Sequence, residues 1–332
     1  MPGANRGPVG AVAAQHRDGS MLILFNPAAG TRRRRRLLRA LGALARAGRP
    51  AEVAETRHPG HATALAREAA AAGTPLVVAA GGDGTIAEVA AGLAGSEARL
   101  GILPFGTANV LAWELGLPLQ PEAAADILAH GCPCLLRPGI ARFGNGGQRL
   151  FVQMLGAGFD AEVVRRLDLG LKRRFGRGAY VLQGMRELPR YRHPRFVAEL
   201  DGEAVEVASA IVSKGRLYAG RHLLAPAARP GAAGFQVALF RRGGAWRAAL
   251  SGLALPLDLL PRLPGVELRA ARRVVLRGEA VPVQADGDSA GSLPVTIVEA
   301  AGPIPVMLPA SAQTMIRSHR VADQGPGRCL IA

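Results

Sequence analysis

The most restrictive feature of this sequence is an apolar run at residues 76–80 that passes directly into the segment 81–85, Gly-Gly-Asp-Gly-Thr. A strand that is apolar on both faces needs cover on both sides, which is the usual setting of a strand in a parallel sheet. The glycines allow a tight turn, and helical periodicity resumes at residues 86–93. The segment therefore predicts a buried parallel strand, a turn and a helix.

The same alternation recurs along the first part of the chain. Strand-like runs at residues 21–25, 51–56 and 100–104 are each followed by a stretch with helical periodicity. Alternating strands and helices define an α/β domain with a parallel sheet. Ligands of such sheets bind beyond the carboxyl ends of the strands, so the turns at that edge are candidate binding loops.

The pattern changes after Pro138, where short alternating segments are separated by turn residues. These segments, among them 150–155, 204–213 and 304–308, predict a β-rich, sandwich-like second domain with a helical insertion around residues 161–188. The predicted organisation has four parts. Residues 1–20 are a disordered lead-in, and residues 21–136 form an α/β nucleotide-binding domain. Residues 137–309 form a β-rich substrate domain, and residues 310–332 are a C-terminal segment that could return to the first domain.

Composition limits the classes of partner. The formal net charge is +16, and the basic charge is almost entirely arginine, because Lys172 and Lys214 are the only lysines. Such a charge favours nucleoside polyphosphates, nucleic acid or an anionic membrane surface, although an arginine-rich coding bias explains it equally well. Aromatic residues make up 4% of the chain, which argues against an RNA binder that stacks bases, and no nucleic-acid reading element is recognisable.

The three cysteines do not suggest a disulfide framework or a zinc site. Cys132 and Cys134 are separated by one residue, whereas zinc sites usually start with two to four between the thiols. The sequence therefore favours a reducing compartment. Since no stretch of 18 uncharged apolar residues is present, we expect a cytoplasmic protein that contacts membranes peripherally.

The glycine segment has the composition of a phosphate-binding loop. Gly81, Gly82 and Gly84 leave the backbone N–H groups free to converge on phosphate oxygens at the start of a helix. Asp83 could hold Mg²⁺, and Thr85 could cap the helix or bind phosphate. An ordinary glycine-rich turn stays open as an alternative. The lysine of a P-loop is missing, so this is a different class of phosphate site.

Three motifs at this edge together resemble one known family. They are Asn-Pro-Ala-Ala-Gly at residues 26–30, the Gly-Gly-Asp-Gly-Thr loop with Glu88, and Leu-Pro-Phe-Gly-Thr-Ala-Asn at 103–109. In this order and spacing they resemble the catalytic domain of diacylglycerol kinases and bacterial soluble lipid kinases. Motifs of the second domain extend the resemblance over most of the chain: 156–160, 218–220, 224–226 and 284–288.

The resemblance implies that ATP lies between the two domains, with Mg²⁺, and that its γ-phosphate goes to a hydroxyl of a membrane lipid. Carried over by position, the ATP-binding residues are Asn26, Pro27, Ala28, Ala29, Gly30, Thr56, Gly81, Gly82, Asp83, Gly84, Thr85, Ile86, Ala87, Gly106, Thr107 and Asn109. Asp288 would be the general base, with Asp286 orienting it or assisting the metal, and Asp83 would hold the metal. Asp288 is one methylene shorter than the glutamate usual in the family.

The sequence departs from the family at three acidic positions. Val110 and Pro138 stand where many members have aspartate, and residues 230–235 lack the aspartate that holds an accessory Mg²⁺ in some members. That accessory metal site is therefore not expected. Two basic segments, 32–36 and 172–177, are candidates for phosphate or membrane contact, and an ordinary solvated surface is the alternative for both.

Two other functions stay open at this point. NAD kinases share the Gly-Gly-Asp-Gly loop and a β-rich second domain, although the Asn-Pro-x-x-Gly and Gly-Thr-x-Asn turns favour lipid kinases. A non-catalytic protein that binds nucleotide or lipid on the same fold would be consistent with the missing acidic residues. A homodimer also stays open.

Overall fold

Strand β3 (Leu76–Gly81) is the apolar run before the glycine loop, and it is an interior strand of the first sheet. It is parallel to β1 (Met21–Phe25) on one side and to β4 (Arg99–Pro104) on the other, and β2 (Ala51–Glu55) continues the parallel order beyond β1. The computed structural model describes residues 21–27, 31–168, 170, 178–310 and 329–330. The lead-in and the basic segment 172–177 lie outside these residues.

Helices cover both faces of this sheet, as the apolar pattern predicts. Val77 and Ala79 pack on one face against α2 (His61–Ala71) and α3 (Asp83–Leu93). Val78 and Ala80 pack on the other face against α1 (Thr31–Arg46) and α5 (Pro121–His130). Alternate residues of a strand point to opposite faces, so one short run supplies both cores. The predicted α/β domain with a parallel sheet is confirmed.

The last strands of the first sheet come from distant parts of the chain. β20 (Ile304–Leu308) lies parallel to β4 and antiparallel to β5 (Cys132–Leu136), and β21 (Cys329–Leu330) lies beside β5. Residues 304–308 were expected in the second domain, so the structure corrects this boundary. The apolar alternation of a strand does not indicate which sheet it joins. Residues 311–328 and 331–332 are outside the described part.

The second domain is a sandwich of two antiparallel six-stranded sheets that enclose a common apolar core. The first sheet has the order β10 (Glu203–Val207), β9 (Phe196–Leu200), β16 (Val274–Arg277), β19 (Val295–Glu299), β6 (Gly139–Phe143) and β7 (Gln148–Phe151). The second has the order β15 (Val266–Ala271), β14 (Phe235–Phe240), β11 (Ser209–Ser213), β8 (Met154–Ala157), β17 (Pro282–Ala285) and β18 (Asp288–Ser292).

Two segments predicted as single strands are each broken into two. Residues 150–155 contribute to β7 and β8, and residues 204–213 contribute to β10 and β11, with each pair divided between the two sheets. The chain changes sheets at both breaks, which the apolar alternation does not reveal. The first break becomes important below because an acidic residue holds it.

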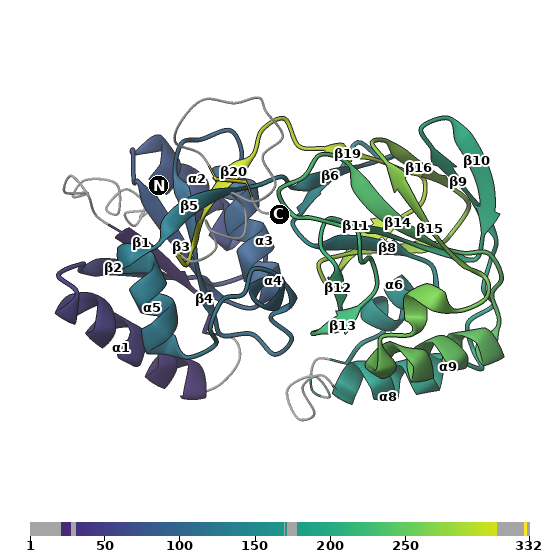
Figure 1. Cartoon of the computed structure of the whole chain (residues 1–332), viewed down its shortest axis with the longest axis horizontal. Helices are drawn as coiled ribbons and strands as arrows, with labels where there is room; N and C mark the ends of the chain where they lie inside the picture. Colours follow the sequence, from purple (N-terminus) through teal and green to yellow (C-terminus); the bar gives the residue numbers. More distant parts are fainter. Residues whose placement is uncertain (1–20, 28–30, 169, 171–177, 311–328, 331–332) are drawn as a thin grey trace, which may run out of the picture.

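Helices gather at one end of the second domain (Figure 1). They are α6 (Phe159–Arg165), α8 (Gly178–Glu187) and α9 (Ala245–Ala254), with the 3₁₀ helices η1 (Leu255–Leu257) and η2 (Leu260–Arg262) after α9. The first two fall in the predicted helical insertion. Helix α9 was not predicted, although Trp246, Leu250 and Leu253 recur at helical spacing. Within the described residues, no helix has the length and apolar character needed to cross a bilayer.

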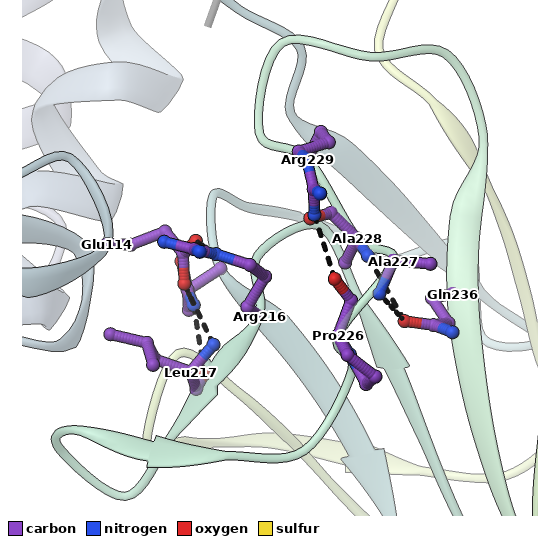
Figure 2. A network of polar contacts seen from close by, with 9 residues as sticks. Glu114, Arg216, Leu217, Pro226, Ala227, Ala228, Arg229 and Gln236 are labelled. Atoms are coloured by element: carbon purple, nitrogen blue, oxygen red, sulfur yellow. Dashed lines mark hydrogen bonds and ion pairs between the residues drawn. The ribbon is translucent and has the colours of Figure 1, made fainter. Parts of the chain in front are cut away.

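Glu114, at the end of α4 (Val110–Glu114), ties the first domain to the second. Its buried carboxylate accepts hydrogen bonds from Arg216 Nε at 3.0 Å and from the backbone N of Leu217, in β12 (Leu217–Tyr218), at 2.8 Å (Figure 2). β12 forms a small ribbon with β13 (His222–Leu223). Gln236 supports the next loop by accepting hydrogen bonds from the N–H groups of Ala227 and Ala228 at 2.8 and 3.1 Å.

Candidate active site

The turns at the carboxyl ends of β1, β3 and β4 are held against one another by short contacts. Asn26 donates from Nδ2 to Thr85 Oγ1 at 3.1 Å, and the N–H of Phe105 donates to Gly81 O at 2.8 Å. A Cβ added to Gly106 would lie 2.5 Å from Gly82 Cα, so position 106 needs glycine for the loops to meet, and a Cβ on Gly82 would be a tight 3.2 Å from Gly106 Cα. The three predicted loops therefore form one surface. Ala28, Ala29 and Gly30 lie outside the described residues.

The predicted ATP-binding residues divide into two groups. Most of those described line one cavity: Asn26, Thr56, Gly82, Asp83, Gly84, Thr85, Gly106 and Thr107. Ile86 and Ala87 instead bury their side chains in the core beneath α3, and Asn109 is buried and shapes its own turn by donating to Gly106 O at 2.9 Å. Direct side-chain contact with a nucleotide is therefore not expected of these three, and Pro27 and Gly81 are likewise outside the cavity lining.

Asp83 contacts the start of α4. Its Oδ1 accepts a hydrogen bond from the backbone N of Leu111 at 3.2 Å. Desolvation by burial raises the pKa of Asp83, and backbone hydrogen bonds from Leu111, Val110 and Asn109 oppose that rise. Asp83 thus connects the loop at residues 81–85 to the loop at residues 103–109, and it also lines the cavity.

Asp286, predicted as the partner of the base, is buried and fully engaged with backbone. Its carboxylate accepts hydrogen bonds from Val152 N at 2.7 Å, and from Gln153 N and Met154 N at 2.9 Å each. These residues form the break between β7 and β8. Desolvation raises its pKa to about 7, and the nearby charge of Asp83 acts in the same direction. Asp286 therefore fixes the corner of the sandwich that faces the loops.

Asp288 has the opposite environment, although it is only two residues away. Its side chain is 48% exposed and lies 3.6 Å from Arg149 Nη2, measured from Oδ2. A Cβ added to Gly84 would lie 2.5 Å from the same Oδ2, so the carboxylate of the second domain sits directly over the glycine loop of the first. Sequence reasoning did not single out Arg149, because an isolated arginine carries no motif.

A buried polar network supports the turn that carries Asp288. Gln284 donates from Nε2 to Asp160 Oδ2 at 2.8 Å and accepts at Oε1 from the N–H of Gly287 at 2.9 Å. The Tyr218 hydroxyl donates to Asp160 Oδ1. Burial raises the pKa of Asp160, and burial together with the Asp160 carboxylate raises that of Tyr218. Three motifs noted in the sequence thus meet in one network, a role that their separate positions did not reveal.

A single cavity of about 1390 Å³ joins these elements. One end is polar and consists of the loops and the acidic turn. The other end lies among α6, α8, α9, η1 and η2 and is lined by apolar side chains: Phe159, Val163, Met185, Ile211, Leu253 and Leu260. The volume exceeds that of a usual single-ligand pocket, which suits two ligands placed end to end.

The donors at the polar end are consistent with a magnesium ion that arrives with a nucleotide. In the part of the chain that the structure describes, no three His, Cys, Asp or Glu side chains form a metal site by themselves. Mg²⁺ in phosphoryl-transfer sites commonly takes one or two carboxylates and completes its coordination with phosphates and water. Asp83 and Asp288 face the same cavity and supply such carboxylates.

The three departures from the family pattern have clear structural settings. Val110 packs with Met154 and Leu224 in an apolar cluster between the domains, and Pro138 accepts a hydrogen bond from Ala300 N at 3.0 Å. At residues 230–235, which lack an aspartate, the buried ammonium of Lys214 donates to the carbonyls of Ala232 and Gly234 at 2.8 Å each. It also donates to Glu299 Oε1 at 2.9 Å. A side-chain cation therefore holds this segment together.

The arginines of the basic segment 32–36, at the start of α1, have different roles. Arg33 lines the cavity, and desolvation by burial lowers its pKa. Arg36 instead donates to Pro104 O at 3.0 Å and to Leu119 O at 2.7 Å, and its guanidinium stacks over Phe105. Arg36 is therefore a structural residue. Glu88, part of the glycine motif, accepts hydrogen bonds from Gly60 N and Ala62 N at the start of α2.

Comparison with known proteins agrees with this architecture. Residues 20–134 match the model of the diacylglycerol kinase catalytic domain, and residues 153–310 match that of the YegS C-terminal NAD kinase beta sandwich-like domain. A Pseudomonas aeruginosa protein named "Probable lipid kinase YegS-like" is 36% identical over 222 residues, 64% of this chain and 69% of its own. The diacylglycerol kinase of Bacillus subtilis is 30% identical over 294 residues, 86% of this chain and 95% of its own.

Solved structures support the same fold. A crystal structure of a diacylglycerol kinase from Bacillus anthracis str. Sterne matches 88% of this chain and 98% of its own, with a TM-score of 0.63 and 20% identity. Another crystal structure from that organism covers the same shares with a TM-score of 0.72 and 21% identity. The fold and the site thus define a two-domain kinase. The chain belongs to the family of diacylglycerol kinases and YegS-like lipid kinases.

Proposed function

We propose that this protein transfers the γ-phosphate of ATP to a hydroxyl of a membrane lipid, diacylglycerol-like or sphingoid-like, with Asp288 as general base. The observation that carries this proposal is the position of the Asp288 carboxylate over Gly84. A carboxylate from one domain thereby faces the glycine loops of the other within one cavity. Phosphoryl transfer needs this arrangement, with anion-binding loops on one side and a proton acceptor on the other.

The nucleotide would occupy the polar end of the cavity. Backbone N–H groups at the start of α3 would bind phosphate oxygens, favoured by the positive end of the helix. Thr56 and Thr107 would contact ATP from either side, as the resemblance implies, and Arg149 would add positive charge near the transferred group. Mg²⁺ held by Asp83 and the phosphates would neutralise the charge that develops in the transition state.

Proton transfer would depend on the contrast between the two aspartates. Asp288 is partly exposed beside Arg149, and it would accept the proton of the lipid hydroxyl as the new bond to phosphorus forms. Asp286 would have a positioning role and would not take the proton itself, because its oxygens already accept hydrogen bonds from backbone N–H groups. Gln284 would hold the turn between them in place.

The apolar end of the cavity favours a lipid acceptor over NAD. Val163, Met185 and Leu253 offer apolar contact to hydrocarbon and no hydrogen-bonding partner for a second nucleotide. Relatives of this chain carry names of lipid kinases, which agrees with that reading. The enzyme would work at the cytoplasmic surface of a membrane, where its excess of arginine meets anionic headgroups.

The test is to incubate the purified protein with γ-labelled ATP, Mg²⁺ and total lipid extract, with NAD in a parallel reaction. We expect label in a lipid product and none in NADP. Label in NADP would show that the phosphate acceptor is NAD and would overturn the proposal of a lipid acceptor. ATP binding without label in any lipid would support a non-catalytic role and overturn the proposal.

A further inference from the structure

An apolar stripe runs along α9 into η1, formed by Trp246, Leu250, Leu253 and Leu257. The spacing of four, three and four residues places these side chains on one helical face. Trp246 is 75% exposed, Leu253 is 69% exposed and Leu257 is 68% exposed. A row of large apolar side chains at this exposure is unusual for a surface that faces only water.

Helix α8 extends this surface with Val181 and Met185, one turn apart and both exposed. In the described ranges, seven of the ten exposed large hydrophobic side chains lie on α8, α9, η1 and the adjoining Leu259. Figure 1 shows both helices at the same end of the second domain. The exposed apolar residues are therefore concentrated at one end of the molecule.

The stripe adjoins the entrance of the cavity. Val181, Met185 and Leu253 line the cavity and are also exposed to the outside. An apolar surface thus continues from the outside of the protein into the apolar end of the site. A hydrocarbon chain that entered along it would stay in contact with apolar side chains, without crossing water.

The charge around the stripe favours an anionic occupant. Residues 241–265 contain four arginines and one acidic residue, Asp258. The Asp258 carboxylate accepts a hydrogen bond from Leu223 N at 2.7 Å, whereas Arg242 and Arg262 are exposed. Apolar residues bordered by arginine, with a tryptophan among them, are typical of surfaces that settle into the interface of an anionic bilayer.

We propose that the apolar stripe, together with Val181 and Met185, docks on an anionic phospholipid bilayer. Trp246 then lies at the level of the headgroups, Leu253 and Leu257 reach the acyl boundary, and the cavity entrance opens toward the membrane. The inference rests on the proposed function only for the purpose of docking, which is to take a lipid acceptor from the bilayer. Docking itself needs neither ATP nor Mg²⁺.

Co-sedimentation with vesicles of equal parts phosphatidylcholine and phosphatidylglycerol, without ATP, measures the docking. Leu257→Asp is compared with Leu38→Asp, because Leu38 on α1 is also 68% exposed but lies in the other domain. We expect Leu257→Asp to weaken the partition by about tenfold, Trp246→Ser with Leu257→Asp to weaken it further, and Leu38→Asp to bind as the wild type does. Equal effects of Leu257→Asp and Leu38→Asp would overturn the proposal.

Fluorescence gives a second readout of the same contact. The chain has two tryptophans, so Trp113→Phe leaves Trp246 as the sole reporter. Its emission is expected to shift to the blue on addition of the same vesicles. Sedimentation of the Trp113→Phe protein with vesicles and no blue shift would assign docking to another face. A wild-type dimer that Leu257→Asp dissociates would assign the stripe to a second copy of the chain.

The two proposals fail in different ways. The kinase assay is repeated with a short-chain diacylglycerol dispersed below its critical micelle concentration, and Leu257 does not line the cavity. Docking predicts that Leu257→Asp keeps wild-type turnover on this dispersed lipid and loses it on vesicles. Vesicle binding without phosphate transfer to any lipid would leave docking standing and remove the kinase. Wild-type turnover of Leu257→Asp on vesicles would remove the docking proposal and leave the kinase standing.

Discussion

The two ends of the cavity are constructed in different ways. At the phosphate end, backbone dominates: Gly82, Gly84 and Gly106 let the loops and the acidic turn approach closely, with few side chains between them. At the apolar end, side chains from α6, α8, α9, β11, η1 and η2 converge, and no short motif contains them. The difference suggests that the phosphate end tolerates few substitutions, whereas the apolar end can change its acceptor without altering the chemistry.

Asp286 and Asp288 are only two residues apart, yet one has a structural role and the other faces the cavity. Asp286 is buried and accepts three backbone hydrogen bonds, and so belongs to the scaffold. Asp288 is half-exposed over the glycine loop, where a substrate can reach it. The following predictions test whether reactivity and support are divided in this way.

The largest effect is expected for Asp288→Asn. If Asp288 is the base, the substitution lowers kcat by about 10²- to 10⁴-fold, because an amide cannot accept the hydroxyl proton. Initial rates with labelled ATP measure this. Asp126→Asn, an exposed aspartate of α5, serves as control and should retain the wild-type rate. A wild-type rate in Asp288→Asn would remove it as the base.

Lys214→Met tests the scaffold of the second domain. Removing the buried ammonium takes its donor from the carbonyls of Ala232 and Gly234 and leaves Glu299 Oε1 with the N–H of Gly234 alone, and we expect a loss of about 3–5 kcal/mol in the free energy of unfolding. Urea titration measures it. Arg277→Met, which removes an ion pair with Glu199 at the surface, should lower stability far less, because exposed ion pairs contribute little. Similar small losses in both variants would argue that Lys214 is dispensable.

Gly84→Ala tests the close approach of the domains. The added Cβ would lie 2.5 Å from Asp288 Oδ2, so the carboxylate must move. We expect kcat to fall by about 10²-fold. Thermal stability should be kept, because alanine suits a helix better than glycine does. Gly42→Ala on α1, where the nearest atom is Arg46 Nη1 at 3.6 Å, is the matched control. A fall in stability that accounts for the lost activity would contradict the steric explanation.

The most gradual effect is expected with pH. The pKa of Asp286 is about 7 when folded and 3.8 as its ordinary value, so the folded state binds this proton more tightly. Stability from this group is therefore greatest at low pH, and the free energy of unfolding falls as pH rises from about 4 to about 7. The slope is at most about 1.4 kcal/mol per pH unit.

Urea titrations of wild type and Asp286→Asn across that range measure the difference between the two proteins. The wild-type advantage over Asp286→Asn should shrink with rising pH and become constant above about pH 7. Parallel curves would mean that Asp286 is ionised throughout, with its charge held by the backbone N–H groups of residues 152–154.

Much of the first domain could be predicted because its signals are local. The alternation of apolar runs and glycine turns predicts strands β1 to β4 as a parallel sheet with its loops at one edge, although the order of the strands in the sheet came only from the structure. The second domain was predicted only as a class. Residues 150–155 change sheets within one apolar run, and β20 joins the first domain, because pairing depends on partners far along the chain. Helix α9 was missed although its apolar spacing was readable.

The sequence by itself determined the loops of the phosphate end, since an apolar strand that runs directly into closely spaced glycines is a local signal. Only the tertiary structure decided which aspartate is anchored and which is accessible. It also brought Lys214 to a segment without an acidic residue, and left the stripe of Trp246 and Leu257 exposed. Burial and hydrogen-bond partners depend on residues distant in sequence, so they appear only once the chain has folded.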